Sequence, residues 1–370
     1  MFELTHLRNG AVLNRHNGKE TEKGLEIRVE GCASIASEIT VNGIPAFRDG
    51  AFFQAPVLLT QKINPIIIKE KSLRGIQTLE IQVVWDKQSF PRYNFYVDDT
   101  IFFLTDLAKE RPASLTDHFY PAFLQRMHKK YGTKFTLNIF SRNMHHPFEL
   151  KDMPDCYKSQ WEDCSDWLKL AFHADGEFPQ YDYAHAAQKL LDDYDRLREE
   201  VIRFAGEKTF IPTEAIHWCT FPASAYRPMR ERGVKILSGW FVDCPELFGE
   251  KQPMRFSELC YNLDLDTCLY LEKHSVIYNP EFDLFFNRHN LCINRTPADQ
   301  IAERIDRICS NPIYNETVEL QTHEQYSFPY YFNYIPDHEE RIENALRRMT
   351  ELGYKPVFFH DGLLGNPAWE

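Results

Sequence analysis

Two adjacent carboxylates end an apolar run in the stretch NFYVDDTIFF, residues 94–103. The run is typical of a β-strand and places Asp98 and Asp99 at its end. Two like charges side by side raise one of the two pKa values unless a cation relieves them. Carboxylates bind divalent metal ions and serve as general bases. The pair therefore indicates a cation site or acid–base chemistry, and the plainer alternative is that Asp98 only caps a helix.

Other polar residues follow apolar runs later in the chain. His173 follows LKLAF, His217 follows TEAI, and His323 with Glu324 follows VELQT. Each histidine alone could be a hydrogen-bonded structural residue. In α/β barrels, however, catalytic residues gather at the carboxyl ends of the strands. Four sites at the ends of different predicted strands favour a functional cluster.

The segment FHADGEF adds a second carboxylate close to His173. Glu177 lies four residues after His173, a spacing that places two side chains on one face of a helical turn. One imidazole, one or two carboxylates and an open position suit a catalytic zinc ion or a similar divalent ion. Asp175 fits the ordinary alternative of an acidic residue at a helix start. His145 and His146 are adjacent on a predicted loop, and we expect both to be solvated.

The elements around these residues predict two domains. Up to residue 88 the chain reads as short β-runs with turn signals, including Asn42-Gly43, which favours a small all-β sandwich of Ig-like type over 1–88. Over 89–370, strand patterns alternate with helical ones, of which 183–207 is the longest. Such alternation predicts an α/β domain with a mostly parallel sheet or barrel.

The composition of the chain argues against several classes of binding partner and of metal site. A net charge of −12 over 370 residues argues against a nucleic acid or an anionic membrane surface as the main partner. No apolar run approaches the length of a membrane span. The nine cysteines contain no CxxC pair, which argues against a thiolate zinc site. The start MFELTHLRNG lacks the apolar core of a signal peptide, so we expect a cytoplasmic protein. Whether it forms a homo-oligomer stays open.

From about residue 93 to the end, the order of the motifs resembles the polysaccharide deacetylase family with the NodB homology domain. That family opens with an Asp-Asp pair at the end of its first strand, as at Asp98 and Asp99. A His-x-x-x-His motif follows at a later strand end, where this chain has His173 and Glu177. A late strand carries a further histidine, which corresponds to His323. The resemblance implies a distorted (β/α)7-type barrel with the β-domain ahead of it.

The resemblance also implies a mechanism and a substrate class. Asp99 would bind a divalent metal ion, with zinc as the first candidate, and Asp98 would be the general base for a metal-bound water. The water would remove an acetyl or other acyl group from a carbohydrate. His323 would protonate the leaving amine or alcohol as the general acid. Glu324 could hold His323 in the required tautomer.

The resemblance leaves the third metal ligand open. His173 matches the first histidine of the family's motif, but Glu177 replaces the second. Glutamate can bind zinc, so Glu177 and His217 both stay candidates for the remaining position. Aromatic rings suit stacking on sugars, and the family has an arginine in a loop near this point. Three residues are therefore candidate substrate contacts: Trp218, Tyr326 and Arg227.

Three other functions stay open. The missing second histidine favours a non-catalytic carbohydrate-binding or scaffold protein on the same barrel. A glycoside hydrolase would use two carboxylates about 5–9.5 Å apart and no metal. A metal-dependent hydrolase of another C–N bond would use the same ligands as a deacetylase. Metal content and sensitivity to a chelator distinguish the first two functions from deacetylation.

Overall fold

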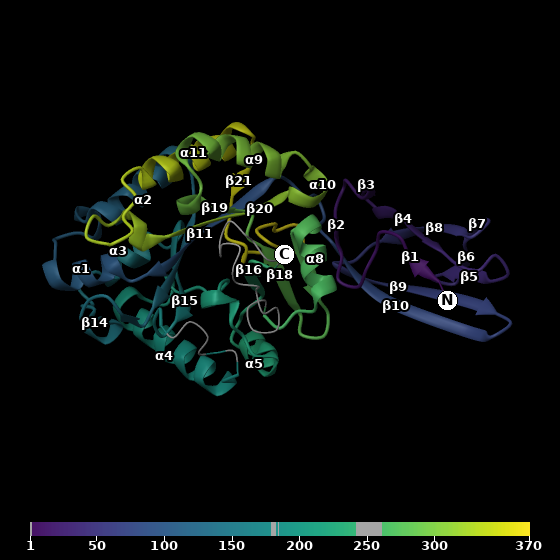
Figure 1. Ribbon diagram of the computed structural model, residues 1–370, viewed down its shortest axis with the longest axis horizontal. Helices are drawn as coiled ribbons and strands as arrows, with labels where there is room; N and C mark the ends of the chain where they lie inside the picture. Colours follow the sequence, from purple (N-terminus) through teal and green to yellow (C-terminus); the bar gives the residue numbers. More distant parts are fainter. Residues whose placement is uncertain (1, 179–182, 184, 242–260) are drawn as a thin grey trace. The chain divides into compact units, whose positions relative to one another are not determined.

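The computed structural model (Figure 1) describes most of the chain. The described residues are 2–178, 183, 185–241 and 261–370. They form a mixed α/β structure with several sheets. None of the described helices is long and apolar enough to cross a lipid bilayer.

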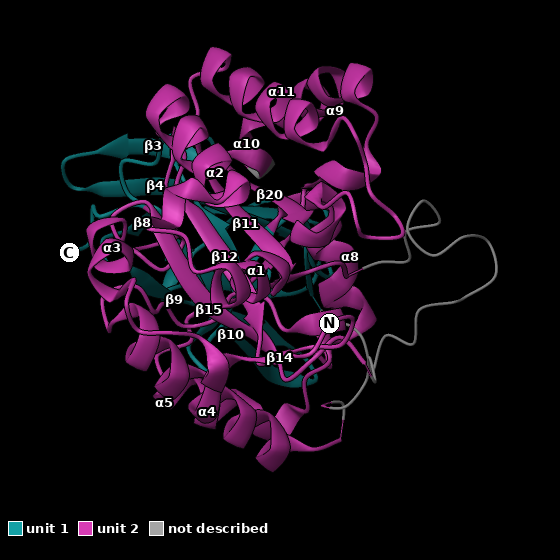
Figure 2. Ribbon diagram, turned by 90° about the vertical axis from the view of Figure 1, so that its left-hand side faces the viewer, with its two compact units in different colours: residues 1–90, 276–285, 366–370 teal, residues 91–275, 286–365 magenta. Residues whose placement is uncertain are grey.

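The chain divides into two compact units (Figure 2). Unit 1 contains residues 1–90, 276–285 and 366–370. Unit 2 contains residues 91–275 and 286–365. The sequence predicted one boundary near residue 88, whereas unit 1 also takes in two later segments. Short segments of this kind are invisible to a sequence pattern, because only contacts in space assign them to a unit.

Unit 1 contains ten β-strands within its described residues up to 85. They are β1 (Glu3–Leu4), β2 (Val12–Leu13), β3 (Gly18–Thr21), β4 (Gly24–Cys32), β5 (Glu38–Val41), β6 (Ile44–Pro45), β7 (Phe47–Asp49), β8 (Phe52–Leu59), β9 (Ile63–Ser72) and β10 (Gly75–Trp85). One five-stranded sheet has the order β1-β4-β8-β7, with β3 on β4, and the other has the order β2-β10-β9-β5-β6. Buried residues such as Val29, Phe53 and Ile68 form one hydrophobic cluster. Along β8, buried and more exposed residues alternate, as in a strand with one face in a core.

The central sheet of unit 2 is parallel, and it positions the polar residues singled out above. Its strands are β11 (Arg92–Thr100), β12 (Phe135–Phe140), β15 (Leu168–Ala174), β19 (Leu291–Cys292), β20 (Thr317–His323) and β21 (Lys355–Pro356). The order is β15-β12-β11-β20-β19, with β21 beside β11. All residues of β11 and β12 are buried, as in a parallel sheet covered on both faces. Because neighbouring parallel strands end at one edge, the last residues of β11, β15 and β20 lie near one another.

Helices cover this sheet on two sides. The described helices of unit 2 are α1 (Phe102–Glu110), α2 (Phe119–Tyr131), α3 (Lys158–Asp163), α4 (Ala187–Ala205), α5 (Tyr226–Glu231), α8 (Leu265–His274), α9 (Ile301–Cys309), α10 (Pro312–Asn315) and α11 (His338–Glu351). Helices α2, α9 and α11 lie on one side of the strands, and α4 and α5 lie on the other (Figures 1 and 2). Along α4 the buried residues Leu190, Tyr194, Leu197 and Val201 recur every three or four positions, which is the stripe that packs on a sheet.

Smaller strands complete the described structure. They are β13 (Arg142–Asn143), β14 (Phe148–Glu149), β16 (Ile236–Gly239), β17 (Val276–Asn279) and β18 (Leu284–Arg288). Strands β13 and β14 form a hairpin, and the other three form a sheet in the order β16-β18-β17. Among the described residues, strand pairing does not join these sheets to the central one in a closed ring. The α/β class is therefore established, and the closed barrel stays a prediction.

Candidate metal centre

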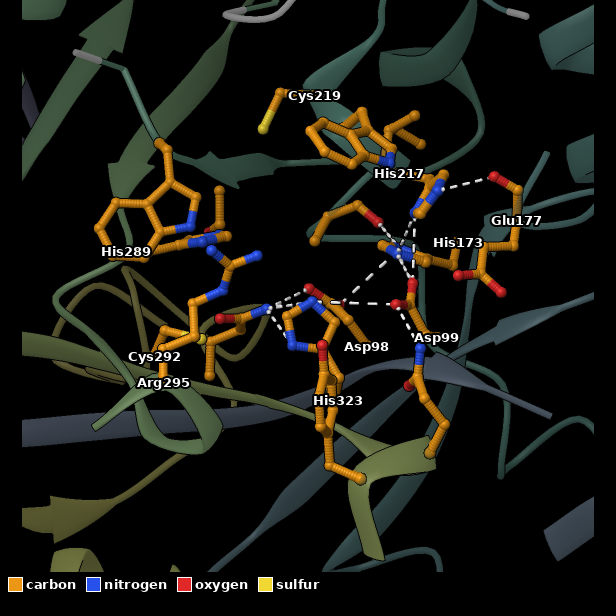
Figure 3. Close-up of a pocket in the computed structure, with 18 of the residues that line it drawn as sticks. Asp98, Asp99, His173, Glu177, His217, Cys219, His289, Cys292, Arg295 and His323 are labelled. Atoms are coloured by element: carbon orange, nitrogen blue, oxygen red, sulfur yellow. Dashed lines mark hydrogen bonds and ion pairs between the residues drawn. The ribbon is translucent and has the colours of Figure 1, made fainter. Parts of the chain in front are cut away.

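Asp98 and Asp99 both line one pocket, although they are neighbours in a β-strand (Figure 3). Adjacent side chains of a regular strand point to opposite faces of the sheet. Here the register of β11 against β12 shifts between Val97 and Thr100, and Asp99 has a φ of 55°. Aspartate tolerates this left-handed backbone better than most residues do. The bulge therefore turns two consecutive carboxylates into the same pocket.

Three side-chain atoms converge beside the bulge. Asp99 Oδ1 lies 3.2 Å from His173 Nε2 and 3.2 Å from His217 Nδ1. The two histidine nitrogens are also 3.2 Å apart, and all three residues are buried. A tetrahedral zinc ion with bonds of about 2.0–2.1 Å separates its ligand atoms by about 3.3 Å. The triangle formed by the three atoms therefore has the size of one face of such a coordination shell.

The other ring nitrogen of each histidine faces a backbone carbonyl. His173 Nδ1 donates to the oxygen of Ala215 at 2.8 Å, and His217 Nε2 donates to the backbone oxygen of Glu177 at 3.1 Å. Since a carbonyl only accepts, these bonds leave lone pairs on His173 Nε2 and His217 Nδ1 in the neutral rings. Within the described part of the chain, the buried oxygen Asp99 Oδ1 has no hydrogen-bond donor. A carboxylate oxygen and two lone pairs that face one another fit a cation.

Charge in the pocket favours the same conclusion. Burial opposes ionisation of Asp99, but the nearby histidines, His323 first among them, outweigh it and hold the pKa of Asp99 well below its usual range. Burial by itself would lower the pKa of His173. The nearby carboxylates of Asp98 and Asp99 outweigh burial, so the net effect is a raised pKa. The site therefore keeps a carboxylate ionised and attracts additional positive charge.

Asp98 lies next to the triangle and is fixed by two amide groups. Its Oδ1 accepts a hydrogen bond from Asn138 Nδ2 at 2.7 Å, and its Oδ2 accepts one from Gln321 Nε2 at 3.0 Å. Asp98 Oδ1 is also 3.8 Å from His173 Nδ1. Neutral donors orient a carboxylate without cancelling its charge, so this arrangement suits a group that accepts a proton.

His323 is the last residue of β20 and reaches into the same pocket. Its Nε2 is 3.9 Å from Asp99 Oδ2, and its Nδ1 donates to Asn294 Oδ1 at 3.0 Å. Burial lowers the pKa of His323. The prediction that Glu324 fixes the tautomer of His323 is wrong, because successive residues leave the strand in different directions. Asn294 supplies that contact instead.

Glu324 binds the first turn of α1, directly after the aspartate pair. Its Oε2 accepts hydrogen bonds from the backbone N–H groups of Ile101 and Phe102 at 2.6 and 2.7 Å. Its Oε1 accepts one from Phe103 at 2.7 Å. The first amides of a helix have no partner within the helix, so the carboxylate satisfies donors that would otherwise be buried and unpaired. Glu324 thereby anchors the backbone that follows Asp99.

We expect Glu324→Ala to lower the free energy of unfolding by about 2–4 kcal/mol, because it leaves buried amides without an acceptor. Glu324→Gln keeps an acceptor oxygen and should lose about half as much. Urea unfolding of the two variants and the wild-type protein measures the difference. Equal stabilities of Glu324→Ala and the wild-type protein would contradict this role.

The carboxylate of Glu177 does not join the triangle. Its Oε2 lies 2.5 Å from His145 Nε2, and only its backbone oxygen contacts His217. The residues after β15 form a loop, so the four-residue spacing from His173 does not correspond to a helical turn. His145 is paired with this carboxylate and partly buried, and the prediction that it is solvated is wrong. Burial and the charge of Asp99 raise the pKa of Glu177, although His145 opposes this shift.

The two candidates for the third ligand can be tested directly. We expect Glu177→Gln to bind metal with the same stoichiometry as the wild-type protein, because its backbone carbonyl still orients His217. His217→Ala should lose most of the bound metal, because it removes a donor atom of the triangle. Elemental analysis after dialysis measures both. Loss of metal from Glu177→Gln, with retention by His217→Ala, would reverse the assignment.

The remaining predicted contacts have mixed outcomes. Trp218 and Tyr326 line the pocket, whereas Arg227 is exposed on α5 and is not among the lining residues. Arg295, which follows β19, lines the pocket and lies across from Glu177 (Figure 3).

The run TEAI ahead of His217 is not a strand. Instead, His217 begins a short 3-10 turn, His217–Cys219.

Several residues that line the pocket or hold its side chains in place escaped the sequence analysis. Asn138 lies in β12, Gln321 lies two residues before His323 in β20, and Asn294 and Arg295 follow β19. The alternation of a strand places Gln321 and His323 on one face, so this residue could have been found from its spacing. Strand β19 has only two residues, too few for a recognisable pattern, and its neighbours could not have been found.

Comparison with known proteins gives no close relative. No family model matches the chain, and no curated protein matches it. A peptidoglycan N-acetylglucosamine deacetylase structure superposes with 10% identity and a TM-score of 0.33, covering 73% of this chain and 88% of that one. A carbohydrate acetylesterase from Xanthomonas citri has 11% identity and a TM-score of 0.17, covering 58% and 61%. Chitinase ChiW from a Paenibacillus species has 9% identity and a TM-score of 0.31, covering 94% and 42%. Superpositions this loose do not establish a function.

Proposed function

We propose that the protein is a metal-dependent hydrolase that removes an acetyl or other acyl group from a carbohydrate. The proposal includes a NodB-like (β/α) barrel with an Ig-like sandwich ahead of it. The observation that carries the proposal is the triangle of Asp99 Oδ1, His173 Nε2 and His217 Nδ1 beside the carboxylate of Asp98. The resemblance of the motif order supplies the reaction type.

The residues present fit a divalent ion, for which zinc is our first candidate. Asp99, His173 and His217 would hold it through one oxygen and two nitrogens. When bound, such an ion lowers the pKa of a coordinated water and polarises a carbonyl group. The backbone oxygens of Ala215 and Glu177 keep the two imidazoles turned toward the site.

The chain's own residues then move the protons. Asp98 would accept a proton from the attacking water at a carboxylate oxygen, while Asn138 and Gln321 hold that carboxylate in place. His323 would donate a proton to the leaving amine or alcohol, with Asn294 fixing its ring. Each such transfer contributes about 100- to 10,000-fold in rate. The acid and the base approach the same pocket from neighbouring strands, β20 and β11.

The size of the pocket supports a small reacting group. Its volume is about 180 Å³, and Trp218 and Tyr326 are among its walls. Pockets that enclose drug-sized ligands measure about 300–1,000 Å³. The pocket therefore suits one acylated group of a sugar, held against aromatic rings, better than a long glycan segment.

Acetate release from N-acetylated and O-acetylated oligosaccharides tests the function. We expect complete removal of metal with a chelator to reduce the rate by at least about 100-fold, and added zinc to restore it. A rate that survives removal of the metal would contradict the proposal and favour a carboxylate-only glycoside hydrolase. Tight metal and glycan binding without any acetate release would favour the non-catalytic alternative.

A further inference from the structure

Strand β10 of unit 1 has an open edge along most of its length. On one side it pairs with β9, and the two strands form one hairpin (Figure 1). On the other side it pairs with β2, and that pairing covers only Val84 and Trp85. Among the described residues, no strand pairs with this second side of β10 over residues 75–81. An unpaired strand edge of this kind can pair with another chain.

A hydrogen bond near the base of the hairpin shows which backbone groups face this edge. Gln82 O accepts a hydrogen bond from Gly10 N, so the backbone of Gln82 points away from β9. Alternate residues of an antiparallel strand point their N–H and C=O groups to the same side. The backbone groups of Ile76, Thr78 and Glu80 therefore face the open edge, and each residue offers one donor and one acceptor.

The side chains along this edge do not protect it. Natural sheets block an open edge with lysine, proline or a bulge. Residues 75–81 read GIQTLEI and contain neither lysine nor proline, and the pairing of β10 with β9 has no register shift. Ile76 is 69% exposed, Leu79 is 39% exposed, and Leu73 at the hairpin turn is fully exposed. Apolar side chains on an edge that is able to pair indicate a partner that covers them.

The charges at the edge are complementary to those of a second copy that runs antiparallel. In the register that places Gln77 opposite Gln77 of the second copy, Arg74 lies opposite Glu80 at each end of the paired segment. Oppositely charged pairs across neighbouring strands stabilise their pairing. Within the described part of the chain, neither Arg74 nor Glu80 has an ion-pair partner. A second copy would supply that partner to both residues.

The same register suits the backbone and the apolar side chains. Ile76 lies opposite Thr78 of the second copy, and since the backbone groups of both residues face the edge, such pairs exchange hydrogen bonds. Leu79 lies opposite Gly75 of the second copy. No described atom is within 4 Å of the position that a Cβ would take at Gly75, so this glycine leaves room for the leucine.

We infer that β10 pairs with β10 of a second copy of this chain, so that the two hairpins form one continuous sheet across a two-fold axis. A second copy is favoured over an unrelated extended peptide, because the edge's own sequence satisfies the charges, the apolar side chains and the backbone together. A two-fold contact also closes after two copies. The paired segment is short, so we expect a dimer that dissociates at micromolar concentrations. The inference does not depend on the proposed function.

Sedimentation velocity of the full chain over a concentration series tests the inference. We expect a monomer–dimer equilibrium for the wild-type protein. Thr78→Pro should raise the dissociation constant by at least about 10-fold, because each copy loses an edge donor. The hydrogen bonds between β9 and β10 should survive, because the backbone of Thr78 faces away from β9. Thr78→Val keeps the donor and should keep the dissociation constant within about 2-fold. As a control, Ile35→Arg changes an apolar residue of unit 1 that is 78% exposed and should have no effect.

A charge exchange tests the register with exposed residues whose substitution does not threaten folding. Arg74→Glu and Glu80→Arg each place like charges opposite one another, and each should raise the dissociation constant by about 3- to 30-fold. The double variant restores opposite charges and should return the constant to within about 3-fold of the wild-type value. A wild-type protein that stays monomeric throughout the series overturns the inference. A dimer that Thr78→Pro leaves intact, or a double variant that dimerises no better than the single ones, also overturns it.

Discussion

Asp99→Asn is expected to lose nearly all bound metal and to lower kcat/KM for acetyl removal by at least about 1,000-fold. Asp99 Oδ1 is 3.2 Å from both histidine nitrogens, so it is the one anionic corner of the triangle. The amide has nearly the same shape but no charge, and a neutral oxygen is a much weaker ligand for a divalent ion. Elemental analysis and acetate release measure the two effects on the same sample.

The fold of Asp99→Asn should survive. The side chain accepts a hydrogen bond from Gln325 Nε2 through Oδ2 at 2.8 Å, and an asparagine oxygen can keep this bond. Removing a buried negative charge also lowers the desolvation cost of the site when no ion is present. A circular dichroism spectrum like that of the wild-type protein is the control. If Asp99→Asn retains one ion per chain, Asp99 is not a ligand and the proposed centre is wrong.

Asp98→Asn is expected to show the opposite combination: metal content like that of the wild-type protein, with kcat lower by about 100- to 10,000-fold. Asp98 lies outside the triangle, so the ligand atoms stay in place. An amide cannot take up the proton of an attacking water. It also has a single acceptor oxygen for Asn138 and Gln321, which both donate to Asp98, so one of these two hydrogen bonds is lost.

Asp98→Asn and Asp99→Asn form a matched pair, because the two variants change one atom each in consecutive residues. The proposed division of roles requires that metal content separates them while activity falls in both. Full activity of the Asp98→Asn variant would show that Asp98 is not the general base. Equal metal loss in both variants would mean that both carboxylates bind the ion, and another proton acceptor would then be needed.

The sequence was informative where function follows from the ends of long strands. Asp98, Asp99, His173 and His323 each lie in the last residues of a buried parallel strand. Apolar runs of this length are recognisable, and parallel strands that end at one edge bring distant residues together. The sequence thereby identified the two aspartates and two of the histidines that line the pocket, and it predicted an α/β unit after an all-β one.

Where strands are short or absent, spacing along the chain was a weaker guide. His217, which the sequence offered as a candidate ligand, follows a loop and begins a 3-10 turn, so its distance from Asp99 depends on the packing of the whole unit. Arg227 was chosen from its position in a loop, but α5 turns it toward solvent. Glu177 was chosen from a helical spacing, but the chain there is a loop that sends its carboxylate to His145. The spacing of residues along the chain predicts where their side chains point only when the secondary structure of that segment is known.

The adjacent aspartates show most clearly what the sequence determines and what only the tertiary structure determines. The sequence alone established that two carboxylates end a buried strand, which is a costly arrangement without a cation or a proton to relieve it. In a regular strand, however, only one of them could face the pocket. The tertiary structure decided otherwise through the bulge between Val97 and Thr100 and the positive φ of Asp99. Hydrogen bonds to β12 and β20 hold that backbone, and no pattern in β11 itself encodes them.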